Sequence, residues 1–439
     1  MKLKNTLFLL FAPLFLLASC ATTNAVSTTA TSTTTLEQPA SNQNVTDAVA
    51  EQVLQNVKDT PQNKYIRGIH ISAPMVGSEK ERKIVMDYFA SSELNAAVID
   101  IKEIDGLIYI DGVKTADENK AYVNAIPHAK EFIQRLKDAG VYTIARIVVF
   151  RDNTMPRRKP SMAVKNPDGT LWMDRKKMTW LDPYNKEAWN YIIEVASRAA
   201  DLGFDEVQFD YIRFPSDGNT KNCRYSVPHT TESATKAIAD FLQEAAKVLH
   251  SKGIKVSIDV FGATTSSDSD MGIGQKIAQM TEPVDYVSPM VYPSHFYKGD
   301  MGIANPNKSP YTTVYLAMRS AIKNKKIPAE KLRPWLQDFS LFGVKYSAKD
   351  VRDQIQAAYD NDIGSWLLWN AAVHYTKSAL EGKEAQDFYD KSDEETTAKT
   401  MIAETGKNFL KKDIAASTAA VAAVVVSTDS VQTDTSTTK

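Results

Sequence analysis

The sequence is poor in cysteine and has no excess of charge of either sign. Its 439 residues include only two cysteines, Cys20 and Cys223. The 52 basic and 53 acidic residues leave a formal net charge of −1, so no overall field attracts the chain to nucleic acid. We therefore expect no nucleic-acid partner. A hydrophobic fraction of 43% and a charged fraction of 24% are typical of a globular protein with a substantial core.

Motifs that identify several common enzyme classes are absent as well. The sequence has no H-E-x-x-H, no histidine cluster and no pair of C-x-x-C motifs, which argues against a zinc site. It also lacks G-x-S-x-G and G-x-x-x-x-G-K-[ST], which removes the usual serine-hydrolase and P-loop interpretations. The acidic run at 266–270 (SSDSD) could bind calcium, but a solvated loop explains it more simply. We expect neither a cofactor nor a metal.

The first twenty residues have the pattern of a secretion signal. Two lysines precede the apolar run LFLLFAPLFLLA, which is too short to cross a membrane comfortably. The run ends in Leu17-Ala18-Ser19-Cys20, which resembles the bacterial lipobox, whose cysteine is lipidated and becomes the mature N-terminus. An ordinary signal cleaved nearby and an uncleaved anchor are the alternatives. Lipidation of Cys20 would leave Cys223 alone, so that no intrachain disulfide could form and the core must supply the stability.

The composition divides the remaining chain into one structural domain and two tails. We predict a lipoprotein signal at 1–20, a Thr/Ser-rich tether at 21–60, a single folded domain at 61–390 and a low-complexity tail at 391–439. We expect both tails to be disordered, because they offer little apolar surface to bury.

Eight strand-like segments alternate with amphipathic helical segments in the predicted domain. This alternation predicts a (β/α)8 barrel. An open doubly wound sheet is the alternative, although no G-x-G-x-x-G follows the first strand. The segments that follow the strands are long, as in a barrel whose site lies at the C-terminal ends of its strands. The predicted strands are 66–72, 96–102, 142–150, 204–214, 255–262, 285–292, 333–339 and 365–370.

The ends of these strands carry carboxylates, basic groups and aromatic rings. Side chains two residues apart share a face of a strand, so the charged groups should converge on the barrel mouth. We predict that Asp210 and Asp259, on neighbouring strands, are the catalytic pair. The predicted substrate-binding residues are His70, Asp100, Lys102, Arg146, Arg213, Tyr292, Asp338, Trp366 and Trp369.

Two carboxyl groups about 5–10 Å apart are what glycosidic-bond hydrolysis requires. Asp210 precedes Arg213 and has Lys102 or Arg146 as possible neighbours, which favours the ionised form that a nucleophile needs. Asp259 lies between apolar residues, which would raise its pKa and suit a general acid. Each residue also has a structural interpretation. Asp210 could merely pair with an arginine, Asp259 could cap a loop, and the rings could close the barrel mouth.

The segment QFDYIRFP at 208–215, preceded by GFDEVQ, resembles the signature of a bacterial "putative glycosyl hydrolase" domain family of unknown function. The similarity extends over most of 65–375. It includes RGIHIS, AAVIDIKE, IARIVVFRD, WLDPYNKEAWNYI, VSIDVFG, DYVSPMVYPSHF and WLQDF.

This resemblance implies a TIM barrel related to glycoside hydrolases, including those similar to α-amylase. In that wider group the nucleophile is an aspartate at the end of strand four, which Asp210 matches. The acid comes from strand five, where Asp259 stands in place of the glutamate of amylase-like barrels.

The sequence therefore predicts a secreted, lipid-anchored barrel that hydrolyses a carbohydrate at the bacterial cell envelope. Its expected partners are a poly- or oligosaccharide and, through the lipid, the membrane. Two other functions stay open: a non-catalytic glycan-binding or envelope-scaffolding protein, and an envelope adhesin or antigen with Thr-rich ends.

Overall fold

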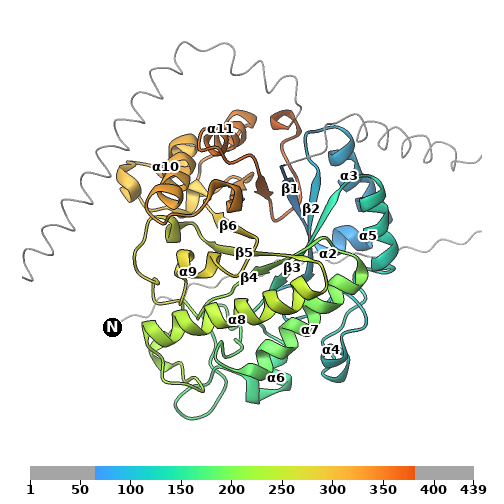
Figure 1. Ribbon diagram of the computed structural model, residues 1–439, viewed down its shortest axis with the longest axis vertical. Helices are drawn as coiled ribbons and strands as arrows, with labels where there is room; N and C mark the ends of the chain where they lie inside the picture. Colours follow the sequence, from blue (N-terminus) through green and yellow to red (C-terminus); the bar gives the residue numbers. More distant parts are fainter. Residues whose placement is uncertain (1–64, 381–439) are drawn as a thin grey trace, which may run out of the picture. The chain divides into compact units, whose positions relative to one another are not determined.

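Eight parallel strands close into a barrel in the computed structural model, which describes residues 65–380 (Figure 1). Each strand pairs with its neighbour in chain order, and the first strand also pairs with the last. The predicted (β/α)8 barrel is thus confirmed, and the open-sheet alternative is wrong. The strands are β1 Arg67–Ile71, β2 Ala96–Lys102, β3 Tyr142–Val148, β4 Glu206–Asp210, β5 Lys255–Phe261, β6 Tyr286–Met290, β7 Trp335–Gln337 and β8 Trp366–Trp369.

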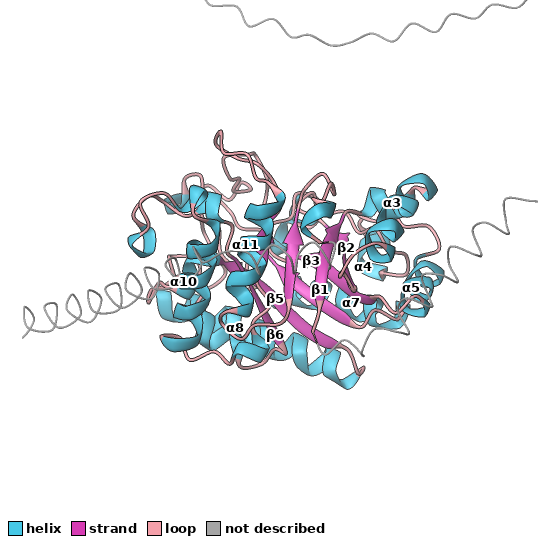
Figure 2. Cartoon of the chain, turned by 90° about the horizontal axis from the view of Figure 1, so that it is seen from above, coloured by secondary structure: helices cyan, strands magenta, loops and turns pink. Residues whose placement is uncertain are grey.

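Helices surround the strands on the outside of the barrel (Figure 2). The boundaries of α7 show how the sequence sets them: the Asn185 side chain accepts the N–H groups of Glu187 and Ala188, and Gly203 ends the helix at φ +94°. The helices are α2 Ala73–Gly77, α3 Glu79–Ala90, α4 Lys114–Glu118, α5 Ala129–Asp138, α6 Met155–Arg158, α7 Lys186–Leu202, α8 Thr231–Ser251, α9 Ile277–Thr281, α10 Pro310–Lys323 and α11 Ala348–Tyr359.

The hydrophobic core has two parts that the alternation of strand side chains separates. Outward-facing residues such as Ile69, Val207 and Ile258 belong to the large cluster that also contains the buried faces of the helices. The barrel interior holds a much smaller apolar cluster, made of Val98, Ile144, Tyr292, Trp335 and Leu367. Most of the remaining interior positions are polar, and those at the C-terminal ends of the strands form the candidate site.

The predictions for 1–20, 21–60 and 391–439, and that for Cys20, lie outside the described residues. Within 65–380, no helix is both long and apolar enough to cross a membrane. The same residues include no group of three or more His, Cys, Asp or Glu side chains arranged to hold a metal ion.

Candidate active site

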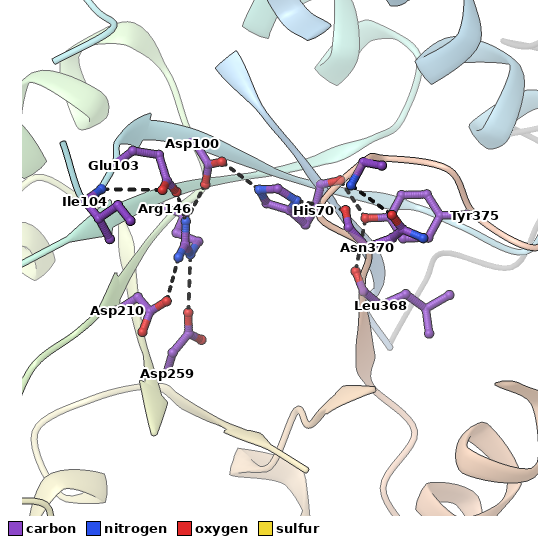
Figure 3. Close-up of polar contacts among 11 residues, drawn as sticks. His70, Asp100, Glu103, Ile104, Arg146, Asp210, Asp259, Leu368, Asn370 and Tyr375 are labelled. Atoms are coloured by element: carbon purple, nitrogen blue, oxygen red, sulfur yellow. Dashed lines mark hydrogen bonds and ion pairs between the residues drawn. The ribbon is translucent and has the colours of Figure 1, made fainter. Parts of the chain in front are cut away.

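Arg146 on β3 is the centre of the charged cluster at the barrel mouth (Figure 3). Its Nη1 donates to Asp100 on β2 at 2.6 Å and also to Glu103, just beyond that strand. Its Nη2 donates to Asp210 on β4 at 2.6 Å, and its Nε lies 3.8 Å from Oδ2 of Asp259 on β5. Four carboxyl groups therefore surround one guanidinium.

The register of the strands explains why the two predicted catalytic residues are neighbours. Gln208 pairs with Ser257 across the β4–β5 ladder. Asp210 and Asp259 each lie two residues further along, so both point into the barrel at the same height. Their contacts with one guanidinium keep the two carboxyl groups no farther apart than the ~9.5 Å upper limit for glycoside hydrolysis.

The charges of the cluster act unequally on its members. Burial alone would raise the pKa of Asp100, but the charges of His70 and Arg146 lower it below its ordinary value. Burial would lower the pKa of Arg146, but the surrounding carboxylates raise it well above its ordinary value. Asp100 and Arg146 thus form a stable ion pair, which leaves the remaining carboxyl groups in excess.

Asp259 lies in a different environment from Asp210. Its side chain is 1% exposed, and burial together with the charge of Asp210 raises its pKa well above the ordinary value, which Arg146 offsets only in part. The indole N–H of Trp335 donates to Asp259 Oδ1 at 2.7 Å. Asp210, in contrast, accepts one hydrogen bond from Arg146 and one from the Tyr211 backbone N–H at 2.6 Å. Asp259 is thus suited to carry a proton, and Asp210 to act as an acceptor.

His70 and Trp369 complete the cluster around Asp100 and Arg146. The Nε2 atom of His70 lies 2.6 Å from Asp100 Oδ2, and its Nδ1 lies 3.4 Å from the Asn370 carbonyl oxygen. The ring of Trp369 stacks on His70 with centroids 4.1 Å apart, and the Arg146 guanidinium carbon lies 4.9 Å from the centre of the same indole. Trp369 therefore covers both groups and remains partly exposed at the mouth.

Tyr292 lies beside the two catalytic candidates. Burial, and then the charges of Asp259 and Asp210, raise the pKa of its phenol well above the ordinary value, so it remains a neutral hydroxyl group. Its ring also contacts His295 and Phe339, with centroids 5.3 and 5.7 Å away. Tyr292 thus connects the carboxyl pair to the loops that follow β6 and β7.

Lys102 was predicted to join this cluster, but the structure places it elsewhere. The β2–β3 pairing shifts register between Asp100 and Lys102, which breaks the alternation on which the prediction relied. The Lys102 Nζ atom is fully buried and contacts the Val148 carbonyl at 2.7 Å and Asp152 Oδ2 at 2.9 Å. Lys102 therefore holds the loop after β3 in place.

Trp366 and Asp338 also lie apart from Arg146. Trp366 points to the outside of the barrel, where its N–H donates to the Tyr359 hydroxyl of α11 at 3.1 Å. Asp338 accepts hydrogen bonds from the backbone N–H and the hydroxyl of Thr376 at 2.8 and 2.7 Å. Both residues thus support local structure around the last two strands.

Arg213 lies in a separate aromatic cluster. Its guanidinium carbon is 5.0, 4.8 and 4.7 Å from the ring centres of Trp180, Tyr211 and Phe261. Its Nη1 donates to the Ser216 hydroxyl at 3.0 Å. Arg213 therefore packs the loop that follows Asp210, and no direct contact joins it to that carboxylate.

Glu103 and Trp335 belong to the site, although neither was predicted. Glu103, whose side chain is 29% exposed, immediately follows β2 in the run AAVIDIKE. Trp335 stands in WLQDF, where alternation on strand seven could have been extended from Gln337 back to it. Two signals in the sequence could have identified these residues. One is an acidic residue directly after a strand, and the other is a tryptophan two positions before the end of a strand.

The opposite, N-terminal end of the barrel interior contains a second buried ion pair. The Nη1 of Arg333 donates to both carboxylate oxygens of Glu206 at 2.9 and 3.0 Å, and the Tyr142 hydroxyl donates to Glu206 Oε2 at 3.1 Å. The guanidinium carbon lies 4.0 Å from the centre of the Tyr286 ring. At this end of the barrel, one carboxylate therefore pairs with one guanidinium.

The closed (β/α)8 barrel, with two neighbouring carboxyl groups at the ends of β4 and β5, has a glycoside-hydrolase-like fold. The chain belongs to the family described as "Putative glycosyl hydrolase domain", which matches residues 68–375. No curated protein matches the chain.

Two solved structures share the same fold. The glycoside hydrolase domain of PgaB (BpsB) from Bordetella bronchiseptica is similar with a TM-score of 0.54, at 13% identity over 74% of this chain and 98% of that one. An α-L-fucosidase isoenzyme from Paenibacillus thiaminolyticus has a TM-score of 0.50, at 13% identity over 74% and 49% of the two chains. A hypothetical protein from Ruminiclostridium thermocellum is 34% identical over 44% of this chain and 97% of that one, with a TM-score of 0.40.

Proposed function

We propose that the protein hydrolyses a glycosidic bond in a carbohydrate of the bacterial cell envelope, with Asp210 and Asp259 as its catalytic carboxyl groups. One observation carries this proposal. The two groups share contacts with Arg146 but have opposite environments, because Asp210 accepts two hydrogen bonds from charged or backbone donors while Asp259 is buried with a raised pKa. Two carboxyl groups with divergent proton affinities are the basis of acid–base division in glycosidases.

Each group then has a defined role. Asp259 donates its proton to the glycosidic oxygen while the bond from that oxygen to the anomeric carbon breaks. Asp210 either attacks the anomeric carbon, or it removes a proton from a water that attacks this carbon and supplies the new hydroxyl group. In the first case a water deprotonated by Asp259 then breaks the bond between Asp210 and the sugar, which frees the carboxylate. Arg146 donates to Asp210 at 2.6 Å, which fixes the position of that carboxyl group in both cases.

The remaining residues of the mouth would bind and orient the sugar. The partly exposed ring of Trp369 offers a stacking surface, and the neutral hydroxyl of Tyr292 can donate a hydrogen bond. Asp100 fixes His70 and Arg146 in position through its two oxygens. The predicted signal and the lipobox cysteine Cys20 would anchor this barrel at the envelope, with 21–60 as the tether.

The test is turnover of a panel of envelope and storage glycans by the purified full-length protein. We expect new reducing ends from the wild type, none from Asp210→Asn, and a loss of about 10²–10⁴-fold in kcat for Asp259→Asn. Asp240→Asn on the outer side of α8 makes the same chemical change at an exposed ion pair, and it should leave turnover unchanged. Equal turnover by Asp210→Asn and the wild type would exclude the proposed roles.

A non-catalytic glycan-binding function is the second candidate. The observation that favours it is burial, because the side chains of Asp210 and Asp259 are only 6% and 1% exposed. This function would be supported if the wild type bound a glycan but formed no product from any glycan of the panel, and if Asp210→Asn bound that glycan with the same affinity.

A further inference from the structure

A cleft of about 630 Å³ lies between the loops that follow β6 and β7. One wall is the loop after β6, which supplies 294–298 and 305–308, and the other is the loop after β7, which supplies Phe342 and Val344. Both loops follow strands, so the cleft lies on the same C-terminal side of the barrel as Arg146.

Two aromatic rings project from the opposite walls of this cleft. Tyr297 is 82% exposed and Phe342 is 79% exposed, whereas no other large hydrophobic residue within 65–380 exceeds 42%. Exposed apolar rings do not help folding, and a pair of them on one cleft marks a binding surface. Rings separated by a cleft can stack on the faces of sugar units.

The backbone under Phe342 is unfavourable for an aromatic residue. Leu341 and Val344 exchange backbone hydrogen bonds at 3.2 and 3.1 Å, which closes a two-residue hairpin turn. Phe342 has φ +51° and Gly343 φ +76° in this turn, positions at which Asn, Asp and Gly are preferred. A strained backbone that displays an exposed ring indicates that the ring serves binding and not stability.

The polar groups of the cleft are amides and lysines. Asn307 donates from Nδ2 to the Leu341 carbonyl at 3.0 Å, which ties the two walls together, while its buried Oδ1 atom has no hydrogen-bond partner. Lys298 and Lys308 are exposed, Asn305 is half-buried, and the lining contains no Asp or Glu. This combination of stacking rings, amides and positive charge fits a glycan that carries acidic groups.

Direct contacts connect the cleft to the end of β7 and to Tyr292. The backbone N–H of Ser294 donates to Gln337 Oε1 at 3.1 Å, and Gln337 is the last residue of β7. The ring of His295 lies 5.3 Å from that of Tyr292, whose phenol responds to the charges of Asp259 and Asp210. His295 therefore belongs both to the lining of the cleft and to the aromatic contacts of Tyr292.

We propose that this cleft binds units of an anionic glycan at a distance from the bond that is cleaved. Tyr297 and Phe342 provide stacking surfaces for the sugar rings. The positive charges of Lys298 and Lys308 give the preference for acidic groups. Cleavage of a bond elsewhere in the same glycan rests on the proposed hydrolase function, whereas binding in the cleft does not.

The test measures binding of the full-length protein to polygalacturonate, hyaluronate and a polyglycerol-phosphate teichoic acid, with neutral dextran and galactan alongside. We expect a Tyr297→Ala/Phe342→Asn protein to lose at least about tenfold in affinity for the anionic polymers. Its melting temperature should not fall, because Asn is better suited than Phe to the positive φ at position 342. A Val123→Ala/Val227→Ala protein changes two other exposed hydrophobic residues and should bind like the wild type.

A Lys298→Gln/Lys308→Gln protein should lose the preference for anionic over neutral polymers and most of the salt dependence of binding. Equal affinity of the wild type for anionic and neutral polymers, or no binding to any anionic polymer, would overturn the proposal. So would unchanged binding by the Tyr297→Ala/Phe342→Asn protein.

The two proposals can fail separately. Binding that depends on Tyr297 and Phe342 in a protein without turnover would support the cleft and reject the hydrolase. Turnover that requires Asp210, together with unchanged binding in the aromatic variant, would support the hydrolase and reject the cleft.

Discussion

The two ends of the barrel interior both contain buried charge, but they balance it differently. At the N-terminal end, Glu206 meets Arg333 alone, and both side chains are fully buried. At the mouth, Arg146 is surrounded by four carboxyl groups and can neutralise only part of their charge. The first arrangement is balanced in charge. The second has an excess of acid, which a bound proton or a cationic partner would relieve.

This difference has a consequence for stability. A balanced buried ion pair contributes little net free energy, because desolvation of the two charges offsets their attraction. An excess of acid destabilises the fold by an amount that depends on pH, since protonation relieves it. Breaking the balanced pair at the N-terminal end should therefore cost the most stability at neutral pH, and changes at the mouth should alter how the wild type's stability depends on pH.

The largest effect should follow from Arg333→Met. The change leaves Glu206 as a buried carboxylate without a counter-charge, and it should lower the free energy of unfolding by about 3–5 kcal/mol. Urea denaturation of the full-length protein measures it. Adding Glu206→Gln should recover most of the loss, and Lys236→Met at an exposed ion pair of α8 should have no measurable effect. A small loss in the single variant would mean that the two ends do not differ as described.

Asp100→Asn should have the next largest effect, and it should depend on pH. The folded-state pKa of Asp100 is lowered, so its stabilisation is present above the unfolded value of 3.8 and disappears as pH falls through the lower folded value. We expect a loss of about 1.5–3 kcal/mol at pH 7, the usual range for hydrogen bonds to a charged group. Unfolding midpoints of the variant and the wild type should converge below pH 4. A constant difference between them would show that Asp100 is not held as a carboxylate.

Asp259→Asn should change stability in the opposite direction. The folded-state pKa of Asp259 is raised, so the wild type is favoured below the unfolded value of 3.8 and loses stability as pH rises through the folded value. The neutral amide avoids this loss, and the variant should gain on the order of 1 kcal/mol over the wild type at neutral pH. The stability gain of the variant should grow as pH rises, although the substitution itself lowers activity. If the stability advantage of Asp259→Asn over the wild type were smaller at pH 8 than at pH 5, the raised pKa would be contradicted.

Much of this architecture could be predicted from the sequence. Alternating strand and helix patterns are enough for the barrel, because eight such units bury their apolar faces in only a few ways. Alternation along β2 to β5 also brought Asp100, Arg146, Asp210 and Asp259 to the same mouth, since parallel strands share their C-terminal edge.

The failures have local causes that the sequence does not reveal. The register shift after Asp100 turned Lys102 away from the interior. On β8 the sequence could not decide between Trp366 and Trp369, because a short apolar run has no intrinsic inside face; the structure brings Trp369 alone against Arg146. The contact of Trp335 with Asp259 depends on how far β7 is offset from β5, which no local pattern specifies.

The smallest effect should come from Trp335→Phe, which removes one hydrogen bond to the mouth and keeps an aromatic ring. The indole N–H stabilises the ionised form of Asp259, so its loss should raise the pKa of that carboxyl further. If Asp259 is the general acid, the alkaline limb of the kcat profile should move to higher pH, while stability changes by about 1 kcal/mol or less. Trp366→Phe removes an indole hydrogen bond on the outside of β8 and should leave the profile where it is. An unchanged profile in both variants, with activity retained, would mean that Asp259 is not the group whose proton limits turnover.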